Sequence, residues 1–206
     1  IISKTYTSDI FREGEITPLR PIGHNTYLLE LFHGPTLAFK DIALQLLGNL
    51  FEEILEKSGQ TITIVGATSG DTGSAAIEAV RGRKNISITM LHPKGRTSDI
   101  QRRQMTSIQD DNVHNIAIEG TFDDCQNLVK GCFADTELRQ TKHISAVNSI
   151  NWARIIAQTV YYVVSAQRLG AAPLFAVPTG NFGNVLAAWV GKNMGANIGP
   201  LVIGSN

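Results

Sequence analysis

Thr61–Leu91, which reads TITIVGATSGDTGSAAIEAVRGRKNISITML, contains the pattern that decides the fold. It begins with a run of β-branched residues, Thr61–Val65, which is typical of a strand covered on both faces. A glycine-rich turn and an alanine-rich helix, Ser74–Arg83, follow, and Ile86–Leu91 supplies a second apolar strand. Strand, helix and strand in this order predict a βαβ unit with two parallel strands.

The same alternation of strands and helices extends over the rest of the chain. Apolar residues at helical spacing predict helices at 41–57, 100–108, 122–139, 148–169 and 185–194, and short runs rich in apolar residues predict strands at 26–32, 113–118, 174–177 and 200–203. We therefore expect an α/β protein with mostly parallel, open, twisted sheets.

The composition argues against several kinds of partner. Lys plus Arg and Asp plus Glu number 18 each, so no global field attracts nucleic acid or an anionic membrane surface. The apolar runs are too short to span a bilayer, and two cysteines with five scattered histidines give no metal-ligand spacing. We expect a cytoplasmic monomer or homodimer that binds a small molecule, with no metal, nucleic-acid or membrane partner.

The segment Phe32–Asp41, FHGPTLAFKD, places Lys40 beside Phe39 at the start of an apolar helix. A lysine in this position loses solvation, which lowers its pKa and makes the neutral amine easier to form. A neutral amine attacks an aldehyde to form a Schiff base, so Lys40 is the candidate anchor for pyridoxal phosphate. The alternative is a solvated lysine in the first turn of the helix.

The loop Thr179–Asn184, TGNFGN, follows a predicted strand and opens a predicted helix. Its backbone N–H groups and the positive end of the helix converge on one point, which suits a phosphate. Neither the Walker A spacing nor G-x-G-x-x-G is present, so a single cofactor phosphate fits better than ATP or a dinucleotide. The alternative is a tight turn in which Gly180 and Gly183 serve only backbone geometry.

The loop Thr68–Gly73, TSGDTG, suits a carboxylate because it combines hydroxyl groups with backbone amides at a helix start. The candidate substrate-binding residues of this loop are Thr68, Ser69, Gly70 and Thr72. Asp71 either approaches a cofactor hydroxyl or caps the helix.

A third group, Asn148-Ser149-Ile150-Asn151-Trp152-Ala153-Arg154, lies at the head of the long predicted helix. Asn148, Asn151 and Arg154 are three residues apart and share a helix face, and Ser149 lies in the same turn. The Arg154 guanidinium is suited to clamp a substrate phosphate, and Arg96 is a candidate second cation. The alternatives are an N-capping Asn148 and a solvated Arg96.

In this order, the four motifs resemble those of the threonine synthase family. The strings that carry the resemblance are His33–Thr36 running into Phe39–Asp41, Gly66–Gly73, Asn148–Asn151 and Pro178–Asn184. The resemblance covers nearly the whole chain. It implies a lyase of the tryptophan-synthase-like pyridoxal-phosphate enzymes that converts O-phospho-L-homoserine and water to L-threonine and phosphate, the last step of threonine biosynthesis.

The resemblance also implies roles for individual residues. Lys40 would bind the cofactor and shuttle protons, and Asp71 would line the site. Gly180, Asn181, Phe182, Gly183 and Asn184 would bind the cofactor, with Asn184 neutral where many relatives have aspartate. Asn151 and Arg154 would face the substrate phosphate.

Two α/β domains with the cofactor between them follow from the same resemblance. Residues 1–45 would carry the Schiff-base lysine as part of the larger domain, 46–145 would form the smaller domain with the SGDTG loop, and 146–206 would return to the larger domain with the phosphate-binding loop. The final predicted strand ends with the sequence, before the further partner and covering helix that a central strand needs, and the family's hydroxyl residue against the pyridine nitrogen comes later than the last residue given. We therefore expect a fragment that lacks N-terminal and C-terminal parts.

Three other functions share parts of this pattern. A threonine-synthase-like phospholyase has the same motifs and releases 2-oxobutanoate, ammonia and phosphate. A serine or threonine dehydratase has no use for a phosphate clamp at Arg154. A non-catalytic module that binds pyridoxal phosphate fits if the 206 residues act alone.

Overall fold

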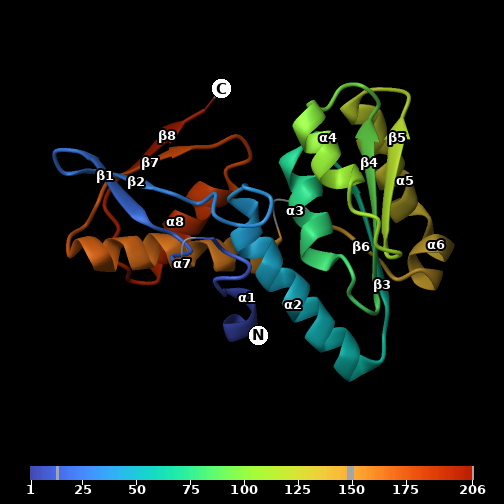
Figure 1. Ribbon diagram of the computed structural model, residues 1–206, viewed down its shortest axis with the longest axis horizontal. Coiled ribbons are helices and arrows are strands. Elements are labelled where there is room, and N and C mark those ends of the chain that lie inside the picture. Colours follow the sequence, from blue (N-terminus) through green and yellow to red (C-terminus); the bar gives the residue numbers. More distant parts are fainter. Residues whose placement is uncertain (13, 148–150, 206) are drawn as a thin grey trace.

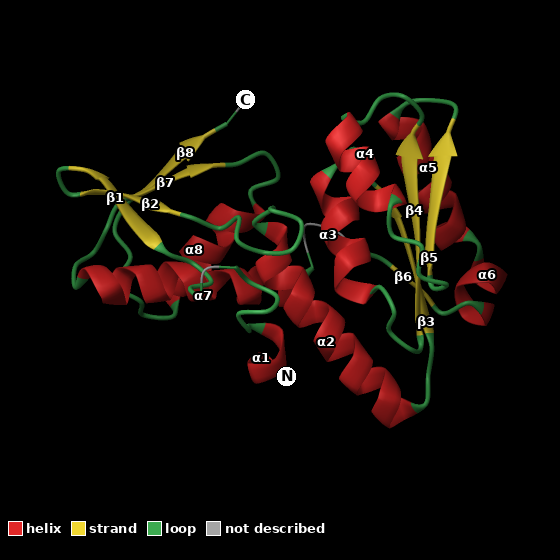
Figure 2. Ribbon diagram, viewed as in Figure 1, coloured by secondary structure: helices red, strands yellow, loops and turns green. Residues whose placement is uncertain are grey.

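The computed structural model describes residues 1–12, 14–147 and 151–205. Helices and strands alternate along most of this length (Figures 1 and 2). The helices are α1 (Ile2–Thr5), α2 (Lys40–Ser58), α3 (Asp71–Val80), α4 (Asp99–Thr106), α5 (Phe122–Ala134), α6 (Thr136–Thr141), α7 (Trp152–Leu169) and α8 (Gly183–Asn193). The strands are β1 (Leu19–Gly23), β2 (Thr26–Leu29), β3 (Ile62–Ala67), β4 (Ile86–Pro93), β5 (Val113–Ile118), β6 (Ile144–Ser145), β7 (Phe175–Pro178) and β8 (Leu201–Gly204).

A four-stranded parallel sheet in the order β5-β4-β3-β6 forms the larger strand group. Its register places Ile64 opposite Ile88 and Ile88 opposite Val113. Figure 2 shows α3 and α4 on one side of this sheet and α5 on the other. A second parallel pair, β7-β8, and an antiparallel hairpin, β1-β2, lie in the other part of the molecule. The predicted α/β class with parallel strands is confirmed.

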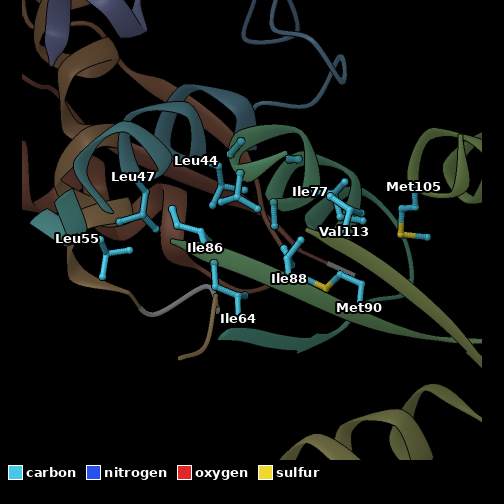
Figure 3. Packing of buried hydrophobic residues seen from close by; sticks show 14 residues of the cluster. Leu44, Leu47, Leu55, Ile64, Ile77, Ile86, Ile88, Met90, Met105 and Val113 are labelled. Atoms are coloured by element: carbon cyan, nitrogen blue, oxygen red, sulfur yellow. The ribbon is translucent and has the colours of Figure 1, made fainter. Parts of the chain in front are cut away.

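Two clusters of buried apolar residues hold these groups of elements together. The first core, drawn in Figure 3, joins α2, α3 and α4 to the four-stranded sheet; Ile64, Ile77 and Ile88 are fully buried in it. The second core joins α7, α8 and β7 and includes Tyr161 and Ala187. The expected division at 45/46 and 145/146 stays a prediction.

Helix α2 belongs to both cores. Ile42, in its first turn, is part of the second core, whereas Leu44, Leu47 and Leu55 are part of the first. In Figure 1, α2 accordingly begins between the two groups of strands and runs along the larger one. The residue that opens this helix is Lys40.

Several element boundaries differ from the sequence predictions. The helix expected over 122–139 is divided, because the Asp135 side chain accepts a hydrogen bond from the Leu138 N–H and caps a separate helix, α6. The alanine-rich helix begins at Asp71 instead of Ser74. Strand β1 lies in a segment for which the sequence predicts no strand. In the described residues, no helix is both long and apolar enough to cross a membrane.

Candidate active site

A buried carboxylate fixes the turn that ends at Lys40. The Asp41 side chain accepts hydrogen bonds from the Thr36 N–H at 2.8 Å and the Thr36 hydroxyl at 2.7 Å. Gly34 permits this arrangement, because a Cβ there would lie 2.5 Å from the Asp41 Cβ. Burial raises the pKa of Asp41, and the Thr36 hydrogen bonds oppose that rise. The HGPT motif therefore fixes the backbone turn that leads into Lys40.

The Lys40 amine is largely removed from solvent and lies among charged groups. Its side chain is 17% exposed, its Nζ is 3.6 Å from Asp71 Oδ2, and it is 4.9 Å from the centre of the Phe39 ring. Burial lowers the pKa of Lys40; the Asp71 carboxylate opposes the fall and the Arg154 charge adds to it. The loss of solvation expected from the sequence is present in the structure.

The loop between β3 and α3 is held by the Thr68 hydroxyl. This oxygen accepts from the N–H groups of Gly70 and Gly73, each at 3.0 Å, and donates to the Gly70 carbonyl. Thr68 is buried, Ser69 and Asp71 are exposed and Thr72 is half-buried. The Asp71 carboxylate makes no capping bond at the start of α3; it contacts Lys40 and a glutamine of α4.

The loop between β7 and α8 is held by Thr179 and Asn184. The Thr179 hydroxyl donates to Asn184 Oδ1 at 2.5 Å and accepts from the Phe182 N–H, and the Asn184 amide donates to the Pro178 carbonyl. Phe182 adopts a left-handed backbone conformation with φ of 58°. A Cβ at Gly180 would meet no atom within 4 Å, so the loop is open to a ligand on that side.

Helix α7 contributes a buried guanidinium to the site. Asn151 caps the helix and accepts a hydrogen bond from the Arg154 N–H at 3.3 Å. Burial lowers the pKa of Arg154, which is 3% exposed, and its charge acts on Lys40. Asn148 and Ser149 lie outside the described residues.

Arg96 has a different environment. It is exposed in the turn after β4, and its charge lowers the pKa of Asp124 at the start of α5, where hydrogen bonds from Thr121 are the larger cause. The structure thus brings Lys40, Asp71 and Arg154 together and shows Arg96 acting on another group.

The Lys40 turn and the β7–α8 loop are both attached to the second core. Ile42, two residues after Lys40, and Val185, next to Asn184, are members of that core. An amine suited to an aldehyde and a helix N-terminus suited to a phosphate are therefore built on one rigid cluster. These are the two groups by which a protein would hold pyridoxal phosphate, so the residues present fit the cofactor.

Sequence reasoning did not single out two glutamines of α4. The Gln101 amide donates to Asp71 Oδ1 at 2.6 Å, and the Gln104 amide donates to the Thr36 carbonyl at 3.0 Å. Ser98, three residues before Gln101, is the N-cap of the helix, a pattern that signals a helix start. The pattern gives no sign of the partners, which lie 30 and 68 residues earlier in the chain.

Comparison with known proteins identifies the family. A family model described as pyridoxal-phosphate dependent enzyme matches residues 11–205. The chain belongs to this family. Within the part of the chain that the structure describes, no group of three or more His, Cys, Asp or Glu side chains is placed to hold a metal ion.

Several relatives that match nearly all of this chain are named threonine synthase. Threonine synthase of Pseudomonas aeruginosa is 53% identical over 209 residues, which cover all of this chain and 44% of that protein. The crystal structure of pyridoxal-phosphate-bound threonine synthase from Brucella melitensis is 53% identical, with a TM-score of 0.90 over 96% of this chain and 43% of that one. The yeast threonine synthase structure is 46% identical, with a TM-score of 0.86 over 97% and 42%. The chain spans less than half the length of these relatives.

Proposed function

We propose that the whole protein is a threonine synthase that converts O-phospho-L-homoserine and water to L-threonine and phosphate. The observation that carries the proposal is the largely buried Lys40 amine, which lies 3.6 Å from the Asp71 carboxylate and within the field of the buried Arg154 guanidinium. An amine, a carboxylate and a guanidinium in one site match a cofactor aldehyde and a phosphorylated amino-acid substrate. The similarity to threonine synthases supports the same reaction.

Lys40 and the β7–α8 loop are the proposed cofactor-binding groups. Lys40 would hold the aldehyde carbon, and the backbone N–H groups of Gly180, Asn181 and Gly183 would hold the phosphate at the positive end of α8. The Phe182 N–H, which donates to the Thr179 hydroxyl, would instead keep the loop in shape. Asn184 organises this loop through Thr179 and adds no charge to it. When bound, pyridoxal phosphate withdraws electrons from the α-carbon of the amino acid that it carries.

The remaining site residues are proposed to hold the substrate. In the loop between β3 and α3, the exposed Ser69 and the half-buried Thr72 would bind the substrate carboxylate at the start of α3. Thr68 and Gly70, which are bonded to each other inside the loop, would fix its shape. Arg154 would hold the substrate phosphate, with Asn151 fixing the first turn of α7. A phosphate that approaches Arg154 would offset the cost of its buried charge.

Lys40 is also the proposed proton carrier. Because burial lowers its pKa, more of the amine is neutral near pH 7 than for an exposed lysine, and a neutral amine accepts a proton. The substrate α-carbon supplies that proton, and the protonated amine can return it after water has added.

The test is to incubate the full-length protein with O-phospho-L-homoserine and to assay threonine, phosphate and 2-oxobutanoate separately. We expect threonine and phosphate in equal amounts. Phosphate with 2-oxobutanoate and no threonine would contradict the proposal and identify a phospholyase.

Two variants locate the activity in this site. Lys40→Ala should lower kcat by at least about a thousandfold, as expected for a residue that binds the cofactor and carries the proton. Arg154→Leu should lower kcat/KM by about a hundredfold or more, whereas Arg103→Ala, an exposed arginine on α4, serves as the control. Unchanged turnover of the phosphorylated substrate in Arg154→Leu would contradict the proposed role of Arg154 in binding the substrate phosphate.

A further inference from the structure

Three side chains, two at the start of α4 and one at the start of α3, form a continuous path to the Lys40 amine. The Ser98 hydroxyl donates to Gln101 Oε1 at 2.8 Å, and the Gln101 amide donates to Asp71 Oδ1 at 2.6 Å. The other carboxylate oxygen, Asp71 Oδ2, is 3.6 Å from Lys40 Nζ. Gln101 therefore contacts the oxygen that faces away from Lys40 and leaves the other one toward the amine.

The position of the Gln101 amide is fixed by its surroundings. A Cβ at Gly70 would lie 2.5 Å from Gln101 Nε2, so the loop leaves room for this amide only because it has no side chain there. Met105, one turn further along α4, is fully buried in the first core, and its Sδ lies 2.8 Å from where a Cβ of Gly73 would be. Helix α4 is thus attached directly to the loop that carries Asp71.

We propose that Gln101 is a positioning residue that holds the Asp71 carboxylate against the Lys40 amine. Asp71 is about half exposed, and an exposed carboxylate has several rotamers to choose from, so a fixed donor on its outer oxygen selects the one that reaches Lys40. The catalytic meaning of this contact rests on the proposed function, whereas the contact itself can be tested in protein freed of cofactor.

The charged groups that face Lys40 decide what should happen when Gln101 is lost. Asp71 and Asp41 raise the pKa of the amine, and Arg154 lowers it. Without the Gln101 donor, Asp71 spends less time at the amine and its contribution shrinks, so the pKa of Lys40 should fall. Asp41 is held separately by Thr36, and its contribution should not change.

The experiment measures how fast the Lys40 amine is labelled as a function of pH. Full-length protein freed of cofactor is treated with acetic anhydride, and the Lys40 peptide is quantified by mass spectrometry. In Gln101→Leu, the midpoint of the pH profile should move to lower pH, and labelling at pH 8 should be about threefold faster at low salt. The midpoint separates a change in ionisation from a change in access, which alters the plateau instead.

Four further variants make the result decisive. Ile100→Ala changes an exposed neighbour on α4 and should leave the midpoint unchanged. Asp71→Asn should shift the midpoint in the same direction as Gln101→Leu, and the double variant should show no further shift, because Gln101 acts only through Asp71. Ser98→Ala, which keeps the glutamine, should give a smaller shift and serves as the test if Gln101→Leu does not fold.

An unchanged midpoint in folded Gln101→Leu or, where that variant is unfolded, in Ser98→Ala would overturn the proposal. So would a Gln101→Leu shift of equal size in the Asp71→Asn background. Because labelling needs no cofactor, these outcomes are independent of the assay for threonine. If the labelling midpoint shifts as expected but no threonine is formed, the positioning role of Gln101 is supported and the proposed reaction is contradicted.

Discussion

The two strand-to-helix loops of the site have the same topology and opposite packing. Both follow a parallel strand and lead into a helix, one between β3 and α3 and the other between β7 and α8. In the first loop, Gly70 and Gly73 are pressed against side chains of α4 and of the loop itself. In the second loop, Gly180 faces open space and Phe182 is 46% exposed.

The difference separates two uses of glycine that look alike in a sequence. In the β3–α3 loop, glycine lets protein groups approach one another, so the loop is tightly packed and exposes Ser69 and Asp71. In the β7–α8 loop, Thr179 and Asn184 hold the backbone from inside, and the outer side is left for a ligand. The following variants test this contrast, beginning with the largest expected effect.

Gly73→Ala should destabilise the protein by about 2–3 kcal/mol, because its Cβ would lie 2.4 Å from Thr68 Cγ2 and 2.8 Å from Met105 Sδ. Urea unfolding followed by circular dichroism measures the loss. Gly180→Ala is the matched control and should change the stability by less than about 0.5 kcal/mol. Equal losses in the two variants would mean that the loops are packed alike.

Thr68→Val should cost about 2 kcal/mol, because the N–H groups of Gly70 and Gly73 lose their acceptor in a buried loop. Thr179→Val removes the corresponding hydroxyl from the more open loop and should cost about 0.5–1 kcal/mol. Both values come from the same unfolding measurement. A larger loss for Thr179→Val would reverse the comparison.

Gly180→Ala should weaken the binding of pyridoxal phosphate about tenfold, because a methyl group would occupy space beside the proposed phosphate. Fluorescence titration gives the affinity. Pyridoxal, which has no phosphate, is the control ligand and should bind both proteins equally. If the affinity for pyridoxal phosphate does not change, the phosphate lies elsewhere.

Lys40→Met should stabilise the protein by about 1 kcal/mol at pH 7, because it removes a charge that burial disfavours. The sign follows from linkage: the pKa of Lys40 is lower in the folded state, so within the window between the two pKa values the unfolded chain binds more protons and stability rises with pH. The gain from Lys40→Met should therefore shrink as the pH rises through that window. Lys130→Met, at an exposed lysine of α5, should show neither effect.

The sequence predicts the fold wherever the pattern is local. The apolar spacing after Lys40 predicts α2 to within one residue at each end, and the β-branched run predicts β3. The start of α3 is missed because the Thr68 hydroxyl collects the N–H groups of Gly70 and Gly73, which lets the helix begin at Asp71. Strand β6, only two residues long, exists because β3 offers it an edge.

The individual residues of the site can be predicted from the sequence, but the hydrogen bonds between distant residues cannot. Lys40, Asp71 and Arg154 carry recognisable chemistry in the sequence, and the structure brings them together. Gln101 gives no such signal, because a glutamine on a polar helix face has many possible partners and only the packing of α4 selects Asp71. Long-range hydrogen bonds of this kind depend on tertiary structure, which no local pattern contains.

Helix α2 joins the two cores, and the end that lies in the second core carries the Lys40 amine. Its first turn is fixed in one core and the rest of its length in the other, so any rotation between the cores must pivot or bend near Ile42. Ser58 is about 24 Å along the helix from Ile42, and a tilt of about 10° about that point would move it by about 4 Å. Such a swing would move the far walls of the site while the amine of Lys40 stayed nearly still.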